Sequence, residues 1–261
     1  MQSLFFGPPD KQLFGVYYQP QRQPARDCGV VLCNPLAPEL GHTCKCFHHL
    51  ALLLAQAGFA AFRFDYFGTG DSAGSGEEGS VRQWMEDIRC ATDELRRQGC
   101  RRFCLAGLRF GATLAARFAT ERDAVDSLVL WEPWVSGQDC LADLQRLHEL
   151  AFTAAGFGCP RTEEEMVGQP FPNRLREEIR ALHLRGSFDN RGRRVLLIED
   201  ASGRSASLGP DLERSGCSFD RETTNLPPFW EDNLGLAFVP RPLLERIVTW
   251  VSEVSISGGR R

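Results

Sequence analysis

The sequence lacks the excess of basic residues that partners rich in phosphate require. Lysine and arginine together number 30, against 34 aspartate and glutamate residues, and the formal net charge is −4. A nucleic acid or an anionic membrane surface is attracted by a positive field, which this balance does not supply. The charge therefore argues against nucleic acid and membrane as partners.

Two kinds of apolar segment are also missing. No window approaches the roughly 18 uninterrupted apolar residues that a membrane-spanning helix needs. The first residues, Met1 to Asp10, contain no basic stretch followed by an apolar run, so no secretory signal is predicted. We therefore expect a cytoplasmic protein, and we expect reduced thiols rather than disulfides among its 10 cysteines.

The sequence does contain a regular alternation of short apolar runs and helical segments. A predicted antiparallel hairpin, Leu4–Phe6 and Leu13–Gln19, comes first. The alternation then predicts a mostly parallel α/β sheet with right-handed crossovers, and ligands in such sheets bind beyond the carboxyl ends of the strands. The expected strands are Gly29–Cys33, Phe59–Phe64, Arg102–Ala106, Ser127–Trp131, Arg194–Glu199 and Ser218–Glu222, and the expected helices of this part are Thr43–Ala57, Val81–Gln98, Gly111–Thr120, Ser207–Ser215 and Arg241–Val254.

The alternation is interrupted between Glu132 and Gly192. This stretch predicts helices near Cys140–Ala154 and Asn173–His183 and no clear strand. Long insertions that follow a strand are typical of lids over a site. We therefore expect one domain, with an α/β core at residues 1–132 and 193–261 and a helical cap at residues 133–192.

The most informative segment is Gly107-Leu108-Arg109-Phe110-Gly111, between the apolar run Arg102–Ala106 and a helix of small residues. A strand, a Gly-x-x-x-Gly turn and a helix make up a nucleophile elbow, in which serine is the usual central residue. Glycines flank that residue because the turn is strained and crowded. Here the central residue is Arg109.

Two further motifs carry a family resemblance. One is the turn Asp65-Tyr66-Phe67-Gly68-Thr69-Gly70-Asp71-Ser72, and the other is the strand-end sequence Asn34-Pro35-Leu36. They correspond in position to a turn that follows the strand before the elbow and to an oxyanion loop. With the elbow, they resemble α/β-hydrolases, near the bacterial serine aminopeptidase-like and exosortase-associated groups. The resemblance implies an α/β-hydrolase fold with a cap, an acid at Glu199 or Asp200, and a histidine in the loop at residues 223–233. That loop has none, since the last histidine is His183.

The missing serine and histidine predict a degenerate triad. Arginine is no nucleophile at neutral pH, because its pKa stays above about 12. A helix N-terminus and a guanidinium both favour anions. We expect a protein that binds a protein partner or a small molecule, with a carboxylate or phosphate the first candidate, at Arg109, Leu108, Phe110, Asn34 and Leu36. Alternatively, Arg109 forms an internal salt bridge, for which the candidate partners are Asp200, Glu199, Glu132 and Glu231.

A hydrolase with a displaced nucleophile is the other hypothesis, with esterase, thioesterase or peptidase-like activity. Its candidate residues are Cys33 or Ser72 with His42. For the first two we prefer the structural interpretations, a buried cysteine at a strand end and a serine that closes a turn. The cluster His42-x-Cys44-x-Cys46-x-His48-His49 has zinc-binding side chains but lacks the usual Cys-x-x-Cys spacing, so no metal and no cofactor are predicted. Homo-oligomerisation stays open. Six aromatic residues are candidates for an apolar pocket under the cap: Trp131, Trp134, Phe152, Phe157, Phe171 and Trp230.

Overall fold

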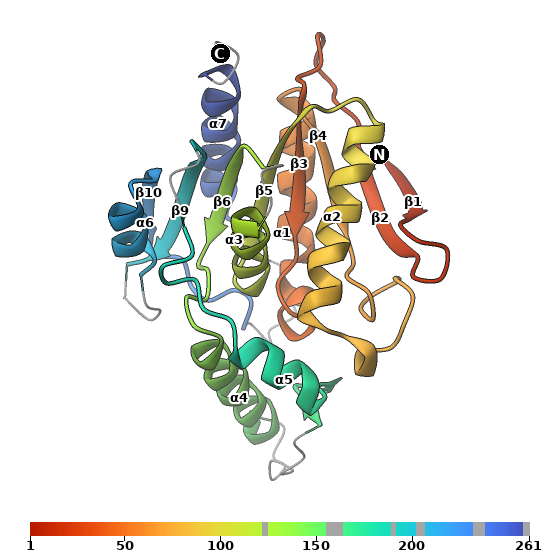
Figure 1. The fold of residues 1–261 in the computed structure, drawn as a ribbon, viewed down its shortest axis with the longest axis vertical. Helices are drawn as coiled ribbons and strands as arrows, with labels where there is room; N and C mark the ends of the chain where they lie inside the picture. The colour runs from red at the N-terminus through yellow and green to blue at the C-terminus, as the bar shows by residue number, and fades with distance from the viewer. Residues whose placement is uncertain (122–124, 155–163, 189–191, 202–206, 232–237, 258–261) are drawn as a thin grey trace.

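An eight-stranded sheet runs through the molecule in the order β1-β2-β4-β3-β5-β6-β9-β10 (Figure 1). The computed structural model describes residues 1–121, 125–154, 164–188, 192–201, 207–231 and 238–257. The strands of the sheet are β1 Gln2–Phe6, β2 Leu13–Tyr18, β3 Cys28–Cys33, β4 Ala60–Phe64, β5 Arg102–Leu108, β6 Ser127–Trp131, β9 Arg194–Asp200 and β10 Ser218–Thr224.

Strand pairing confirms the predicted α/β class. β1 pairs antiparallel with β2, and β2 pairs antiparallel with β4, while every other neighbouring pair in the sheet is parallel. All six residues of β3 are buried, as expected for a central parallel strand with helices on both of its faces. The predicted N-terminal hairpin is therefore the antiparallel edge of a mostly parallel sheet.

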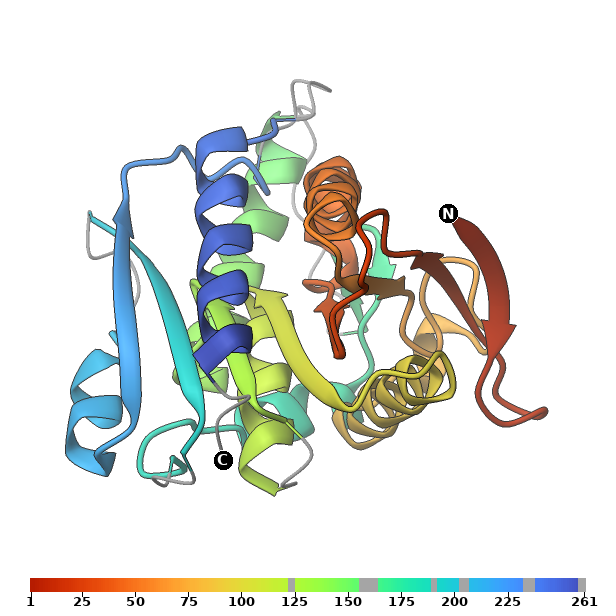
Figure 2. The same cartoon turned by 90° about the horizontal axis from the view of Figure 1, so that it is seen from above.

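Helices cover both faces of this sheet, as Figure 2 shows from above. One face packs against α1 (Ala37–Gln56) and α7 (Arg241–Ser257), and the other packs against α2 (Val81–Arg97) and α3 (Phe110–Glu121). The short helix α6 (Gly209–Ser215) precedes β10. Within the described ranges, no helix combines the length and the apolar character needed to cross a membrane.

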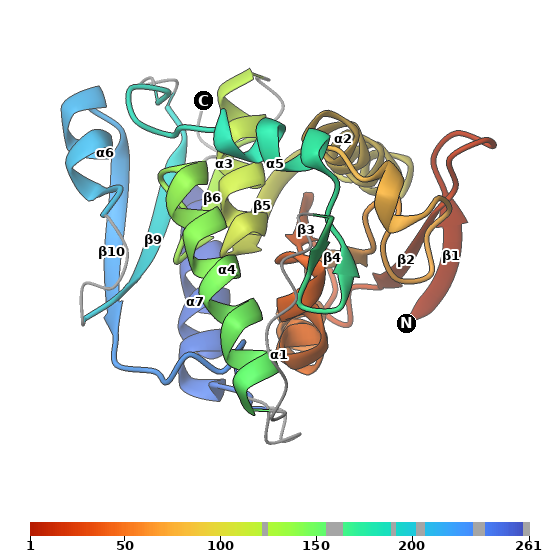
Figure 3. The ribbon, with the colours of Figure 1, turned by 90° about the horizontal axis from the view of Figure 1, so that it is seen from below.

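The described helices and strands between β6 and β9 lie beyond the carboxyl ends of the parallel strands, as Figure 3 shows from below. We call these elements the α4–α5 segment: α4 Gly137–Ala154, β7 Glu165–Met166, β8 Gln169–Pro170 and α5 Asn173–Arg180. The expectation of no strand here was wrong, because β7 and β8 form a small hairpin around Val167 and Gly168, which both have positive φ. Strands of two residues are too short to show a two-residue periodicity. Helix α5 also ends earlier than predicted, before His183.

Helix α1 begins six residues before the predicted Thr43, after the extended residue Leu36. No side-chain cap marks its start, but Pro38 lies within its first two positions and an acidic residue lies in its first turn, which are both signals of a helix start. The earlier start places Glu39 in the first helical turn, with its side chain buried against the core. This shift brings a carboxylate to the predicted elbow.

Candidate functional site

The elbow has the predicted strand–turn–helix geometry. β5 ends at Leu108, Arg109 has a φ of 56°, and α3 begins at Phe110. A Cβ atom on Gly111 would lie 2.2 Å from the carbonyl oxygen of Cys33, and one on Gly107 would lie 2.5 Å from the backbone nitrogen of Ala112. Glycine is required at both positions because backbone atoms occupy the space of any larger side chain.

The Arg109 side chain lies inside the protein, 5% exposed, between two carboxylates. Its Nε donates a hydrogen bond of 2.8 Å to Oε1 of Glu39, and its Nη2 forms an ion pair with Oδ2 of Asp143. The guanidinium carbon also lies 4.3 Å from the ring centroid of Trp134 and 4.9 Å from that of Trp230. Arg109 therefore has its charge partners within the chain.

The ion pairs continue across the surface of the elbow. Oδ1 of Asp143 accepts a hydrogen bond of 2.9 Å from Arg146, and the same guanidinium donates to Glu231 over 2.7 Å. Glu39 belongs to α1, Asp143 and Arg146 belong to α4, and Glu231 lies in the loop after β10. We call these residues and Arg109 the elbow charge network. It joins the α/β core to the α4–α5 segment.

Burial and ion pairing shift the pKa in opposite directions for Glu39 and for Arg109, the two most buried members of the network. Burial raises the pKa of Glu39, while the guanidinium of Arg109 opposes that rise. Burial by itself would lower the pKa of Arg109, but the carboxylates of Glu39 and Asp143 outweigh it and hold that pKa above its ordinary value. Arg109 is therefore charged throughout the physiological pH range.

An internal salt bridge was one of the two expectations for Arg109, but its partners differ from the four that the sequence suggested. Glu199, at the end of β9, pairs with Arg221 over 3.3 Å and accepts a hydrogen bond from Ser207. Asp200 lies beside it on the same strand, and Glu231 joins the network through its ion pair with Arg146. Sequence reasoning did not identify Glu39 as a partner because it placed the start of α1 too late. It did not identify Asp143 because the position of α4 relative to the sheet depends on tertiary packing.

A pocket of about 380 Å³ opens beside Arg109. The buried indole nitrogen of Trp230 has no hydrogen-bond partner among the described residues. Glu132 directly follows β6 with a φ of 46°, and its backbone N–H donates to the carbonyl of Ile198. We call this the elbow pocket, and its lining residues are Arg109, Glu132, Trp134, Asp143, Arg146, Trp230 and Glu231.

The sequence grouped Asn34, Leu36 and Phe110 with Arg109 as one binding site, and the structure divides them. These three residues line a second cavity of about 40 Å³, together with Tyr66, Trp84 and Phe171 among others. We call it the Tyr66 cavity. Arg109 does not line it. Leu108 is fully buried in the apolar cluster under α1 and α7.

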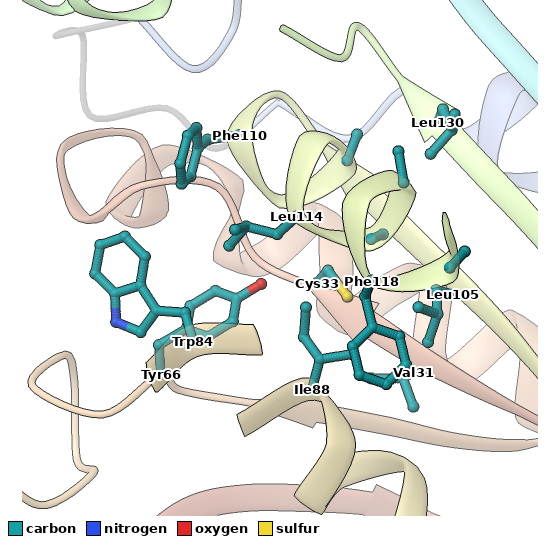
Figure 4. Packing of buried hydrophobic residues seen from close by; sticks show 14 of the residues in the cluster. Val31, Cys33, Tyr66, Trp84, Ile88, Leu105, Phe110, Leu114, Phe118 and Leu130 are labelled. Carbon is teal, nitrogen blue, oxygen red and sulfur yellow. The ribbon is translucent and has the colours of Figure 1, made fainter. Parts of the chain in front are cut away.

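Cys33 and His42 do not form a nucleophile–base pair. Cys33 is 0% exposed, and burial raises the pKa of its thiol to about 12. It packs in the cluster between the sheet and helices α2 and α3, near Tyr66, Ile88 and Phe118 (Figure 4). His42 belongs to α1, on the opposite face of the sheet. The buried-hydrophobe interpretation of Cys33 fits this position.

Ser72 closes a turn. Its hydroxyl donates a hydrogen bond of 2.6 Å to the carbonyl of Asp65 and accepts one of 2.9 Å from the backbone N–H of Phe14. The first bond closes the loop after β4, and the second ties this loop to strand β2. The hydroxyl is therefore committed to backbone groups, as in the structural alternative for this residue.

The His/Cys cluster of α1 is spread over several environments. Cys46 is buried, which raises its pKa to about 12, and Nδ1 of His48 lies 2.8 Å from the hydroxyl of Tyr18. Nδ1 of His49 lies 2.9 Å from the carbonyl oxygen of Lys45 in the helix itself. Across the part of the chain that the structure describes, no three potential ligands come together as a metal site.

The six candidate pocket aromatics are divided in the same way. Trp134 and Trp230 line the elbow pocket and Phe171 lines the Tyr66 cavity. Trp131 packs against Phe229 with ring centroids 5.6 Å apart, and Phe152 packs against His148 at 4.9 Å. Phe157 lies outside the described residues.

Comparison with known proteins identifies the family. The family model "Serine aminopeptidase, S33" matches residues 21–182, more than half of the chain. No curated protein matches the sequence. The fold is similar to that of Est1E from Butyrivibrio proteoclasticus with ferulic acid bound, at a TM-score of 0.71 and 16% identity over 97% of this chain and 99% of the other.

Two further solved structures share this fold. An esterase from Pyrococcus furiosus has a TM-score of 0.68 and 13% identity, over 97% of this chain and 91% of the other. Proline iminopeptidase from Mycobacterium smegmatis has a TM-score of 0.64 and 12% identity, over 98% of this chain and 100% of the other. Fold similarity at this identity does not carry an activity over. The fold and the family match agree, and the chain belongs to the serine aminopeptidase, S33 family of α/β-hydrolases.

Proposed function

We propose that this α/β-hydrolase family member binds a small molecule in the elbow pocket and does not hydrolyse it through a covalent intermediate. The observation that carries the proposal is the side chain of Arg109, which fills the centre of the elbow and is held by Glu39, Asp143 and two tryptophan rings. In this proposal, residues 133–192 act as a cap that supplies one side of the pocket through α4.

The composition of the remaining triad positions supports a degenerate triad. The loop that precedes α7 contains no histidine, because His183 is the last histidine in the sequence. A serine hydrolase that loses its nucleophile and base loses several orders of magnitude in rate, because the groups act as a unit. Neither Cys33 nor Ser72 offers a replacement, since one is buried with a raised pKa and the other bonds to backbone atoms.

The charges around the elbow pocket favour a cationic ligand over the anion expected from the sequence. Three carboxylates line the pocket, those of Glu132, Asp143 and Glu231, against the two guanidiniums of Arg109 and Arg146. A carboxylate or phosphate ligand would compete with Asp143 and Glu39 for Arg109. An ammonium group would compete with Arg109 and Arg146 for Asp143 and Glu231 in the same way, but it would enter a pocket that has one more carboxylate than guanidiniums. We therefore favour a small primary amine.

The test measures binding by calorimetry with n-butylamine, butyrate and inorganic phosphate as probes. We expect butylamine to bind more tightly than either anion. Glu231→Gln removes one carboxylate of the pocket and should weaken butylamine binding about fivefold, the effect of a partly exposed charge pair. Glu222→Gln is the matched control, because Glu222 also pairs with an arginine, Arg246, but does not line the pocket. Tighter binding of the anions, or no binding of any probe, would refute the proposed ligand class.

A second candidate function is hydrolysis with a non-standard nucleophile. Family membership and the similarity in fold to an esterase favour it, more strongly than they favour a protein without catalysis. The test is a panel of p-nitrophenyl esters and acyl thioesters with the wild type and with Cys33→Ala, Ser72→Ala and His42→Ala. Turnover above a heat-inactivated control, abolished by one of these substitutions, would replace the binding proposal with a hydrolase.

A further inference from the structure

Strand β1 forms one edge of the eight-stranded sheet. It is the first strand in the order of the sheet, and within the described ranges it pairs with β2 alone. In Figure 2 it is the dark red strand at the outer end of the sheet, next to the N-terminus. The outer side of such a strand carries a row of backbone N–H and C=O groups, which can pair with a further strand.

Charged side chains protect the opposite edge of the sheet, but they do not protect β1. The edge strand β10 contains three consecutive charged residues, Asp220, Arg221 and Glu222, and charge is a common protection of sheet edges. Strand β1 has the sequence QSLFF, without charge and without proline. Every residue of β1 therefore keeps its backbone N–H, and no charged side chain of β1 opposes an approaching strand.

The side chains of β1 also leave apolar surface at this edge. Phe5 is 59% exposed, although its ring centroid lies 5.6 Å from that of Phe14 on β2. Leu4 points to the other face, where it packs partly buried against the cluster that contains Phe6. A strand added to β1 would remove apolar area of Phe5 from water, which favours association.

The absence of charge on β1 favours a second copy of the same chain as the added strand. When two identical strands pair antiparallel about a two-fold axis, side chains of one face meet their own copies on that face. Two copies of β10 centred on Arg221 would place two guanidiniums opposite each other, and like charges in that position are destabilising. Two copies of β1 bring no like charges together.

We propose that two copies of this chain associate through β1, with the two strands antiparallel and Leu4 on the two-fold axis. This register pairs the whole strand, because Gln2 lies opposite Phe6 of the second copy and Ser3 lies opposite its Phe5. The two Phe5 side chains are then diagonal neighbours on one face, at a spacing of about 7–8 Å that aromatic side chains can span. The two sheets become one continuous sheet.

Sedimentation velocity of the full chain tests the proposal at about 5 to 500 µM, since interfaces below about 1,000 Å² give weak and reversible association. We expect a monomer at the lowest concentration and a dimer at the highest. Phe5→Lys should weaken the dimer at least about tenfold, because it brings two like charges together and removes apolar contact. Leu150→Lys is the matched control, because Leu150 is 50% exposed as well but belongs to α4.

A mixture of two variants tests the register. Phe5→Glu should be monomeric by itself, as Phe5→Lys should be, but an equimolar mixture of the two should dimerise because their side chains at position 5 are diagonal neighbours of opposite charge. The proposal would be overturned by a monomer at every concentration, by species larger than a dimer, by a dimer that Phe5→Lys leaves unchanged or Leu150→Lys weakens equally, or by a mixture that stays monomeric. No residue of β1 lines the elbow pocket, so butylamine binding in Phe5→Lys reports separately on the proposed function.

Discussion

Removing the charge of Arg109 tests the physical reason for an arginine at the elbow. Arg109→Met keeps an unbranched side chain at the left-handed backbone position and leaves the Glu39 carboxylate without its hydrogen-bond donor. Glu39 is 1% exposed, so water cannot replace the lost partner. We therefore expect a large loss of stability.

The magnitude follows from the buried pair. Breaking a buried ion pair by removing one partner costs about 3–5 kcal/mol, because an uncompensated charge stays inside the protein. The contacts of the guanidinium with Trp134 and Trp230 add about 0.5–1 kcal/mol each, although methionine retains part of that packing. The expected loss at pH 7 is therefore about 3–5 kcal/mol, and most of it arises from Glu39.

The loss should shrink as the pH falls. Burial already raises the pKa of Glu39 in the wild type, and removing the guanidinium that opposes this rise raises it further. A carboxyl group whose folded-state pKa is raised stabilises the folded state as the pH falls through that pKa. Arg109→Met should consequently recover part of its stability relative to the wild type between pH 7 and pH 5.

Urea unfolding followed by tryptophan fluorescence measures these effects. The control is the double variant Arg109→Met/Glu39→Gln, in which the buried charge is absent. It should be at least about 2 kcal/mol more stable than Arg109→Met at pH 7, with a flatter pH dependence. A loss below 1 kcal/mol for Arg109→Met, or an equal loss in the double variant, would refute the claim that Arg109 compensates a buried carboxylate.

Three further predictions concern other positions. Burial raises the pKa of Asp87 to about 6, so the wild type should gain up to about 3 kcal/mol relative to Asp87→Asn as the pH falls from 7 to 4, measured by urea unfolding. Gly111→Ala should lower the melting temperature strongly because its Cβ would meet backbone atoms, whereas Gly41→Ala, at a helical position with no atom within 4 Å, should raise it slightly. Arg109→Ser should show no esterase activity with p-nitrophenyl butyrate, because the loop before α7 has no histidine to act as a base. Measurable turnover would contradict the claim that the missing histidine prevents hydrolysis.

The class of the fold and the framework of the elbow could be predicted from the amino-acid sequence. The alternation of apolar runs and helices is a local property, because each strand or helix shows its own burial pattern within a few residues. The structural role of the glycines at 107 and 111 could be predicted for the same reason, since a strained turn restricts which residues can lie next to it. The absence of a serine at the elbow and of a histidine before the last helix is likewise visible in the sequence without a structure.

The surroundings of Arg109, in contrast, depend on how distant segments of the chain pack together. Its partners Glu39 and Asp143 lie 70 and 34 residues away in the sequence, on two helices whose positions depend on packing. Arg109 and Phe110 are adjacent, but one lines the elbow pocket and the other lines the Tyr66 cavity. Neighbouring side chains at a strained turn leave the backbone in different directions, so a motif that is continuous in sequence contributes to two separate sites.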